Sequence, residues 1–142
     1  MKAQKVLVPL DSSAISARTV KGLIAFKKRL SPPLTLLHVL DLSMLAILGF
    51  PEKTRDEFEL RVRQEAAQFI AAQKDLFSAA GITVETLVKE GHARETICAL
   101  ADSGEYDLLV IGRNPVSGLR DLLFGQVSNF VVHQTKCPVL II

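Results

Sequence analysis

The sequence predicts a doubly wound α/β domain, in which five parallel strands form one sheet with helices on both faces. Strand-like and helical segments alternate along the chain, which is the order that a parallel sheet requires. The strand-like runs are apolar nearly throughout, as expected when both faces of a sheet are covered and neither meets water. A chain of 142 residues with 49% hydrophobic residues fits one such domain with a good core. We therefore expect a single domain over residues 1–142.

The predicted strands are five short runs, rich in leucine and β-branched residues and bounded by turn formers. They are KVLVPL (5–10), LTLLHVL (34–40), ITVETLV (82–88), DLLVIG (107–112) and PVLII (138–142). Helical spacing is clearest over 54–80, where Thr54 and Glu57 form a capping-box pattern and Gly81 ends the helix. The residues expected near the buried face of this helix are Phe58, Val62, Ala66, Phe69, Ile70, Gln73, Leu76 and Phe77.

Charge and composition favour neither a nucleic-acid-binding nor a membrane protein. The formal net charge is +2, and the 23% of charged residues have interspersed signs, with no basic stripe or acidic tail. The start of the chain lacks a signal-peptide pattern, which favours a cytoplasmic location. Cys98 and Cys137 are far apart in sequence and are expected as free thiols or small buried hydrophobes, not as a disulfide or metal site.

The apolar segment 42–50, LSMLAILGF, is well short of the roughly 20 residues that a membrane span needs. It is also too apolar for an idle loop. Three roles stay open for it: packing on the body of the domain, binding a partner, or covering a ligand cleft.

In a doubly wound sheet, ligands bind beyond the carboxyl ends of the strands, at the point where the strand order reverses. The residues that follow the first strand include Pro9 and Asp11, and Val39 lies at the end of the second. The fourth strand leads into IGRNPVSGLRDLLFGQVS, residues 111–128. We expect these three segments to meet around one ligand site.

Four stretches of the chain together resemble a universal stress protein domain. They are VPLDSS, LLHVLD, GHARETI and DLLVIGRNPVSGLRDLLFGQVSNFVVHQTKCPVLII. The resemblance covers essentially the whole chain. It implies an adenine nucleotide alpha hydrolase-like fold with flavodoxin-like layers, and a homodimer that forms through the last strand.

Universal stress proteins that bind ATP resemble one another in a Gly-x2-Gly-x9-Gly-Ser/Thr pattern after the fourth strand. Here the same spacing reads Gly112, Pro115, Gly125 and Gln126. Glycine lets the backbone approach a phosphate, and backbone N–H groups at a helix start bind its oxygens. Pro115 has no N–H and a fixed φ, and Gln126 is longer than serine, so the phosphate loop must be rebuilt if it binds a nucleotide.

The resemblance implies that Asp11 and Val39 lie at the adenine. The ribose and phosphate wall would come from Ile111, Gly112, Asn114, Gly125 and Val127. Arg113 is a candidate for supplying the charge that the altered loop lacks. The expected site residues are therefore Pro9, Asp11, Val39, Ile111, Gly112, Arg113, Asn114, Gly125, Gln126 and Val127, with ATP (and Mg²⁺) or AMP as ligand, or none if the altered loop has lost binding.

Each of these assignments has a purely structural alternative. Asp11 is also a candidate cap of the first helix, with Ser12 and Ser13. The two glycines are also turn formers, and Asn-Pro is a common turn pair. His38, His92 and His133 lack the spacing of a metal site, and Asp107, which precedes a strand, is expected to be a turn residue and not a catalytic acid.

Motifs of other nucleotide-binding and enzyme classes are missing from the sequence. Neither GxxxxGK[ST] nor GxGxxG after the first strand is present. The acidic cluster of a receiver domain is not found, and GHARE is not the histidine-glycine-histidine signature of a nucleotidyl transferase. We find no catalytic constellation, so at most slow ATP hydrolysis is expected. Two hypotheses stay open: an adenine-nucleotide-responsive binding module, and a dimeric protein-interaction module without nucleotide, whose protein partner the sequence does not name.

Overall fold

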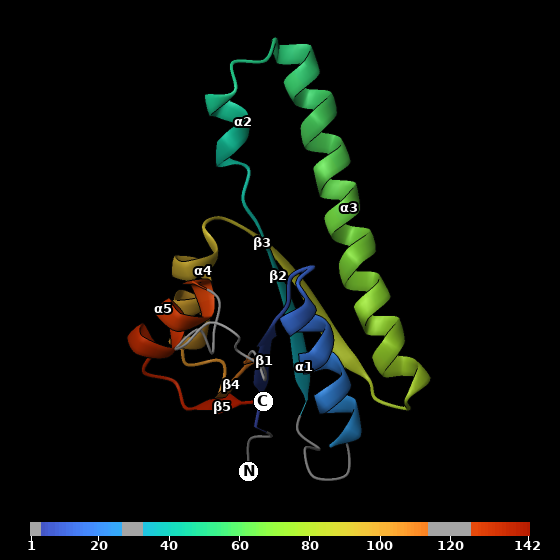
Figure 1. Ribbon diagram of the computed structural model, residues 1–142, viewed down its shortest axis with the longest axis vertical. Helices are drawn as coiled ribbons and strands as arrows, with labels where there is room; N and C mark the ends of the chain where they lie inside the picture. The colour runs from blue at the N-terminus through green and yellow to red at the C-terminus, as the bar shows by residue number, and fades with distance from the viewer. Residues whose placement is uncertain (1–3, 27–32, 114–125) are drawn as a thin grey trace.

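The structure, a computed structural model, describes residues 4–26, 33–113 and 126–142 and arranges them as a parallel sheet between two layers of helices (Figure 1). The strand order is β3-β2-β1-β4-β5. The strands are β1 (Val6–Pro9), β2 (Leu34–Leu40), β3 (Val84–Glu90), β4 (Leu108–Ile111) and β5 (Val139–Ile141). The helices are α1 (Ala14–Ala25), α2 (Ser43–Ile47), α3 (Glu52–Ala79), α4 (Ala93–Ala101) and α5 (Gln126–Gln134). The predicted doubly wound α/β class is confirmed.

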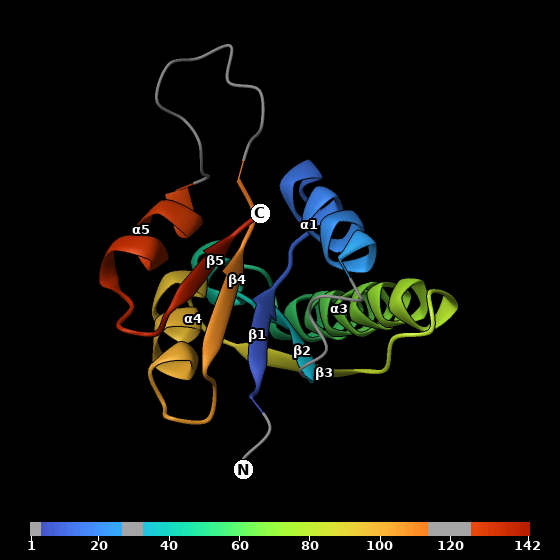
Figure 2. The ribbon, with the colours of Figure 1, turned by 90° about the horizontal axis from the view of Figure 1, so that it is seen from below.

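Helices cover both faces of the sheet, with α1 and α3 on one side and α4 and α5 on the other (Figure 2). The side chains of a strand alternate between the two faces, so β1 contributes Val6 and Val8 to the core under α1 and α3, and Leu7 to the core under α4 and α5. All three are at most 1% exposed. The central strands are therefore apolar throughout, because their side chains are buried on both faces of the sheet.

The predicted strand positions agree closely with the structure, and β2 has the predicted bounds. β3 begins two residues later than expected, because the N–H of Ile82 donates to the carbonyl of Phe77 in the turn after α3 and is not free for the sheet. β3 is also an edge strand, and most of its side chains are exposed. The expectation of strands covered on both faces is thus correct for the centre of the sheet and wrong for β3.

The long helix α3 begins before the predicted capping box. Pro51 is its N-cap residue and has no side-chain cap hydrogen bond, so Thr54 lies inside the helix and the predicted Thr54–Glu57 cap is wrong. A proline disfavours the helical conformation of the residue before it, so the helix does not extend back beyond Pro51. The predicted stop is correct, since Gly81 follows the last turn with φ of +79°.

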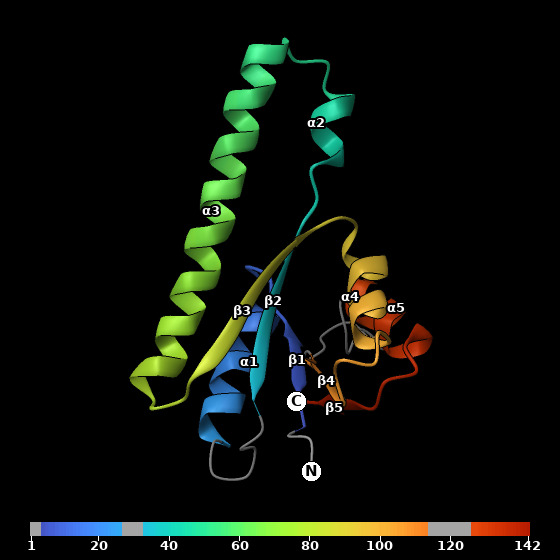
Figure 3. The same cartoon turned by 180° about the vertical axis from the view of Figure 1, so that it is seen from behind.

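The first part of α3 extends past the sheet, and α2 lies beside it (Figure 3). Every residue from 52 to 61 is exposed except the half-buried Glu59, whereas Ala66, Ile70 and Phe77 are buried against the sheet. The predicted core position of Phe58 is wrong: its ring is 41% exposed and stacks on Phe50, with 6.1 Å between ring centroids. Leu76, also expected near the buried face, is 52% exposed.

The segment 42–50 forms α2 and the turn that leads into α3. Leu45 is buried, but Met44, Ile47 and Leu48 are 51 to 73% exposed. This segment is therefore anchored by the buried Leu45, while its other large apolar side chains are exposed. Within the described ranges, no helix is long and apolar enough to span a membrane.

Candidate functional site

A cleft of about 420 Å³ opens at the carboxyl ends of β1 and β4, where the strand order reverses. Such a switch point is the usual ligand position in an open α/β sheet. The cleft brings together seven of the predicted site residues from four separate parts of the chain: Pro9, Asp11, Val39, Ile111, Gly112, Gln126 and Val127. Predicted residues Asn114 and Gly125, together with Pro115, lie outside the described residues.

Asp11 is held in a fixed orientation at the start of α1. Its Oδ1 accepts hydrogen bonds from the N–H of Ser13 at 2.8 Å and from the hydroxyl of Ser16 at 3.0 Å. Its own N–H donates to Ser16 Oγ at 2.8 Å. Partial removal from water raises the pKa of Asp11, but the hydrogen bonds from Ser13 and Ser16 and the nearby His38 together hold it below its ordinary value. The carboxylate is therefore ionised at neutral pH and presents a fixed acceptor at the cleft.

The helix cap itself is Ser13, whose Oγ accepts from the N–H of Ser16. Asp11 precedes the cap by two residues and organises it, so the structural reading and the ligand reading of Asp11 are compatible.

His38 contacts the end of β1 beside the cleft. Its Nδ1 lies 3.0 Å from the carbonyl oxygen of Leu10, and its ring lies 4.8 Å from the ring of Phe69, centroid to centroid. The histidine thus links the end of β1 to α3, while Val39, the next residue, lines the cleft. His38 is a packing residue, as expected.

Gly112 has a packing role that is independent of any ligand. A Cβ atom at this position would overlap the hydroxyl of Thr19 and would lie 2.8 Å from Cγ2 of Ile15, both on α1. Thr19 is only 2% exposed, and its hydroxyl donates to the carbonyl of Ile15 at 2.8 Å. The end of β4 can approach α1 this closely only because residue 112 has no side chain.

Arg113 is not among the described residues that line the cleft. Its N–H donates to the backbone oxygen of Ile142 at 2.9 Å, and the guanidinium of Arg18 donates to the same oxygen at 3.0 Å. The side chain of Ile142 packs on Gly22 of α1. The backbone of Arg113 therefore fixes the end of β5 against α1.

α4 and α5 provide the wall of the cleft that faces Asp11. Ala93 and Ile97 of α4 line it, as do Ser128 and Val131 of α5. These residues were not predicted as site residues, although Ala93 and Ile97 belong to the GHARETI stretch that carries part of the family resemblance. Most of the wall is apolar, which suits the face of a planar ring.

The first turn of α4 also contacts the first turn of α5. Arg94 Nη2 lies 3.5 Å from Gln126 Oε1, and the guanidinium carbon lies 5.5 Å from the centroid of the Phe130 ring. Gln126 is thus held at the cleft from outside. The sequence gives no signal for this contact, because it depends on how two helices from separate parts of the chain are packed.

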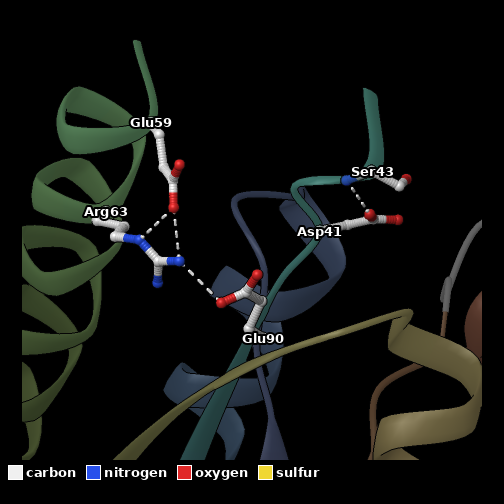
Figure 4. Close-up of polar contacts among 5 residues, drawn as sticks. All are labelled: Asp41, Ser43, Glu59, Arg63 and Glu90. Carbon is white, nitrogen blue, oxygen red and sulfur yellow. Dashed lines mark hydrogen bonds and ion pairs between the residues drawn. The ribbon is translucent and has the colours of Figure 1, made fainter. Parts of the chain in front are cut away.

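A second polar cluster lies where β2 and β3 end (Figure 4). Arg63 forms ion pairs with Glu59 and with Glu90, each at 2.8 Å, and so links α3 to β3. Asp41 accepts a hydrogen bond from the N–H of Ser43 at 2.9 Å, and its pKa is lowered to about 2, chiefly by hydrogen bonding from Ser43. Four of these five residues are exposed and Glu59 is half-buried, and ion pairs at the surface contribute little to stability.

The histidines and cysteines do not converge. His92 is the N-cap residue of α4 and lies 3.2 Å from a carboxylate oxygen of Asp41. Cys98 and Cys137 are free, and burial raises the pKa of both thiols. Among the described residues, no group of three His, Cys, Asp or Glu side chains could hold a metal ion.

The site is thus a cleft at the switch point of a parallel sheet, with a fixed carboxylate on one side and an apolar wall on the other, which is the usual ligand position in an α/β domain. The sequence model described as "Universal stress protein family" matches residues 2–142. The chain therefore belongs to the universal stress protein family.

Individual relatives agree along nearly the full length. Universal stress protein YxiE of Bacillus subtilis is 29% identical over 144 residues, which is 97% of each chain. The solved structure of the protein MJ0577 of Methanocaldococcus jannaschii covers 100% of this chain and 96% of its own, with a TM-score of 0.76 and 25% identity. A solved universal stress protein in complex with cAMP is 26% identical with a TM-score of 0.60, covering 100% of this chain and 98% of its own.

Proposed function

We propose that this universal stress protein binds an adenine nucleotide, ATP or AMP, in the cleft at the ends of β1 and β4. The observation that carries the proposal is the convergence of Asp11, Val39, Gly112 and Gln126 on one cleft from four parts of the chain. A carboxylate beside an apolar wall suits an adenine ring, whose amino group donates hydrogen bonds and whose faces are apolar. A 26% identical relative holds an adenine nucleotide, cAMP.

The nucleotide is best tested by calorimetric titration of ATP, AMP and GTP into the wild type and two matched variants. Asp11→Asn changes the cleft carboxylate. Asp41→Asn is its control, because Asp41 also follows a strand and also accepts a hydrogen bond from the N–H two residues later. We expect Asp11→Asn to weaken adenine-nucleotide binding about tenfold or more, as when a hydrogen bond to a charged group is lost, and Asp41→Asn to leave it unchanged. Absence of heat with ATP and AMP at millimolar concentration would exclude the proposal. Phosphate release, followed in the same samples, measures any ATP hydrolysis.

We also propose that two copies of the chain form a dimer through β5. In this proposal the dimer is cytoplasmic and presents the surface that a protein partner binds. β5 is an edge strand, and Ile141 on it is 42% exposed. An exposed apolar edge favours pairing with another strand. This dimer also serves the second candidate function, an interaction module without nucleotide, which the replacement of the family's Ser/Thr by Gln126 favours.

Native mass spectrometry reads oligomeric state and co-purified nucleotide in one spectrum. Ile141→Arg should convert the dimer to a monomer. Val88→Arg is the matched control, because Val88 is 40% exposed on the opposite edge strand, β3. A wild-type monomer at high concentration, or equal effects of the two variants, would rule out pairing through β5. A dimer that stays free of nucleotide after ATP is added would favour the interaction module.

A further inference from the structure

The outer rim of the cleft carries an exposed cation, the guanidinium of Arg94. Arg94 lies on the first turn of α4, and its side chain is exposed. It reaches α5, where its guanidinium contacts Gln126 and the ring of Phe130. Gln126 in turn is both the first residue of α5 and a lining residue of the cleft. The guanidinium is therefore one side chain away from the ligand space.

Neither the helix dipole nor the contact with Gln126 does much to stabilise Arg94 at its position, where its other contact is the ring of Phe130. A cation near a helix N-terminus is opposed by the helix dipole, which favours acidic residues there. Its contact with Gln126, at 3.5 Å, is at the outer limit of a hydrogen bond. None of the carboxylates in the described ranges forms an ion pair with it. The arginine is held in place by weak contacts and keeps most of its hydrogen-bonding capacity.

The electrostatics of this rim suit an anion. The N-terminal turns of α4 and α5 both lie at the cleft, since Ala93 and Gln126 line it, and each helix start carries a partial positive charge. Arg94 adds a full charge between them. A guanidinium donates two parallel hydrogen bonds to a phosphate, which are shorter and stronger than its present contact with a neutral amide.

We propose that Arg94 binds the phosphate of the nucleotide, exchanging its weak contact with the Gln126 oxygen for hydrogen bonds to phosphate oxygens. This inference rests on the proposed function and makes it more specific: the site prefers nucleoside phosphates to nucleosides. Neither Arg94 nor Arg113 is itself among the described lining residues, but the guanidinium of Arg94 contacts Gln126, which does line the cleft. We therefore assign the charge to Arg94.

The test is the ratio of affinities for AMP and adenosine, measured by titration calorimetry on the wild type, Arg94→Gln, Arg94→Lys and Arg61→Gln. Arg61 is exposed on α3, away from the cleft, so its variant controls for the loss of one positive charge. In Arg94→Gln we expect AMP to bind about 10 to 100 times more weakly and adenosine to bind as before, as when a charge-assisted hydrogen bond is removed. Arg94→Lys should retain part of the preference for AMP, and Arg61→Gln all of it.

Two results would overturn this inference while leaving the proposed function intact. One is an unchanged AMP-to-adenosine ratio in Arg94→Gln, and the other is an equal loss of affinity for both ligands, which would mean that the arginine only positions α4 against α5. A wild type that binds neither adenosine nor AMP would overturn both. Melting of the unliganded variants by circular dichroism separates binding effects from unfolding, and we expect each variant to melt within about 2 °C of the wild type because surface substitutions have small effects.

Discussion

The substitution Gly112→Ala tests whether this glycine is needed for packing even without a ligand. The new methyl group would overlap the hydroxyl of Thr19 and press on Ile15 at 2.8 Å. Thr19 is buried, so its side chain can move aside only by breaking its hydrogen bond to the carbonyl of Ile15. Both effects destabilise the folded state.

The magnitude follows from two contributions. Overpacking a close contact costs about 1 to 3 kcal/mol, and losing a buried hydrogen bond about 1 kcal/mol more, for a total of about 2 to 4 kcal/mol. For a domain of this size, each kcal/mol lowers the melting temperature by about 3 to 4 °C. We therefore expect Gly112→Ala to melt about 6 to 16 °C below the wild type in scanning calorimetry without nucleotide.

Thr19→Ala provides the internal control. Removing the hydroxyl creates space for the methyl group at residue 112. We therefore expect the loss of stability caused by Gly112→Ala in the Thr19→Ala variant to be no more than about half of the loss that it causes in the wild type. A double-mutant cycle measures this coupling directly. A loss of less than about 2 °C in the single Gly112→Ala variant, or identical losses in the two backgrounds, would refute the packing explanation.

Two further predictions concern stability away from the cleft. Phe77→Ala should lower the free energy of unfolding by about 3 to 5 kcal/mol, because Phe77 is 0% exposed in the core. Leu76→Ala should change it by about 0.5 kcal/mol or less, because that side chain is 52% exposed. Similar urea midpoints for the two variants would contradict the packing of α3. Hydrogen bonding from Thr135 lowers the pKa of Asp102 below 3.8, so its contribution to stability is full above that pH and is lost as the pH falls through the lowered pKa. The difference in urea midpoint between wild type and Asp102→Asn should therefore be present at pH 7 and shrink below pH 4 or so, and a difference independent of pH would contradict this assignment.

The positions of the site residues on the strands were predictable because parallel strands all end at the same edge of a sheet. Once β1, β2 and β4 were recognised as apolar runs, Asp11, Val39 and Gly112 had to lie at that edge. β2 was predicted residue for residue because it is buried on both faces and its composition has no competing signal. β3 begins later than predicted because the N–H of Ile82 donates to Phe77 in the turn after α3, a contact that the apolar pattern does not reveal.

The helical wall of the cleft was not predictable in the same way. Ala93 and Ile97 line the cleft because α4 packs against β2 and α5, and local sequence does not encode this tertiary packing. The Arg94–Gln126 contact joins residues 32 positions apart on two different helices. The wrong cap at Thr54 has a local cause, because a polar pattern inside a surface helix resembles a helix start. The better signal was Pro51, since proline disfavours a helical residue before it.

The overhang of α3 turns this helix into a lever. The buried residues of this helix are Ala66, Ile70 and Phe77, and none of residues 52–65 is buried. These overhanging residues span about 21 Å at 1.5 Å per residue. A tilt of about 5° about Ala66 would move the far end by about 2 Å, given that length. A displacement at the sheet too small to change the core is thereby amplified at the exposed apolar tip formed by α2, Phe50 and Phe58.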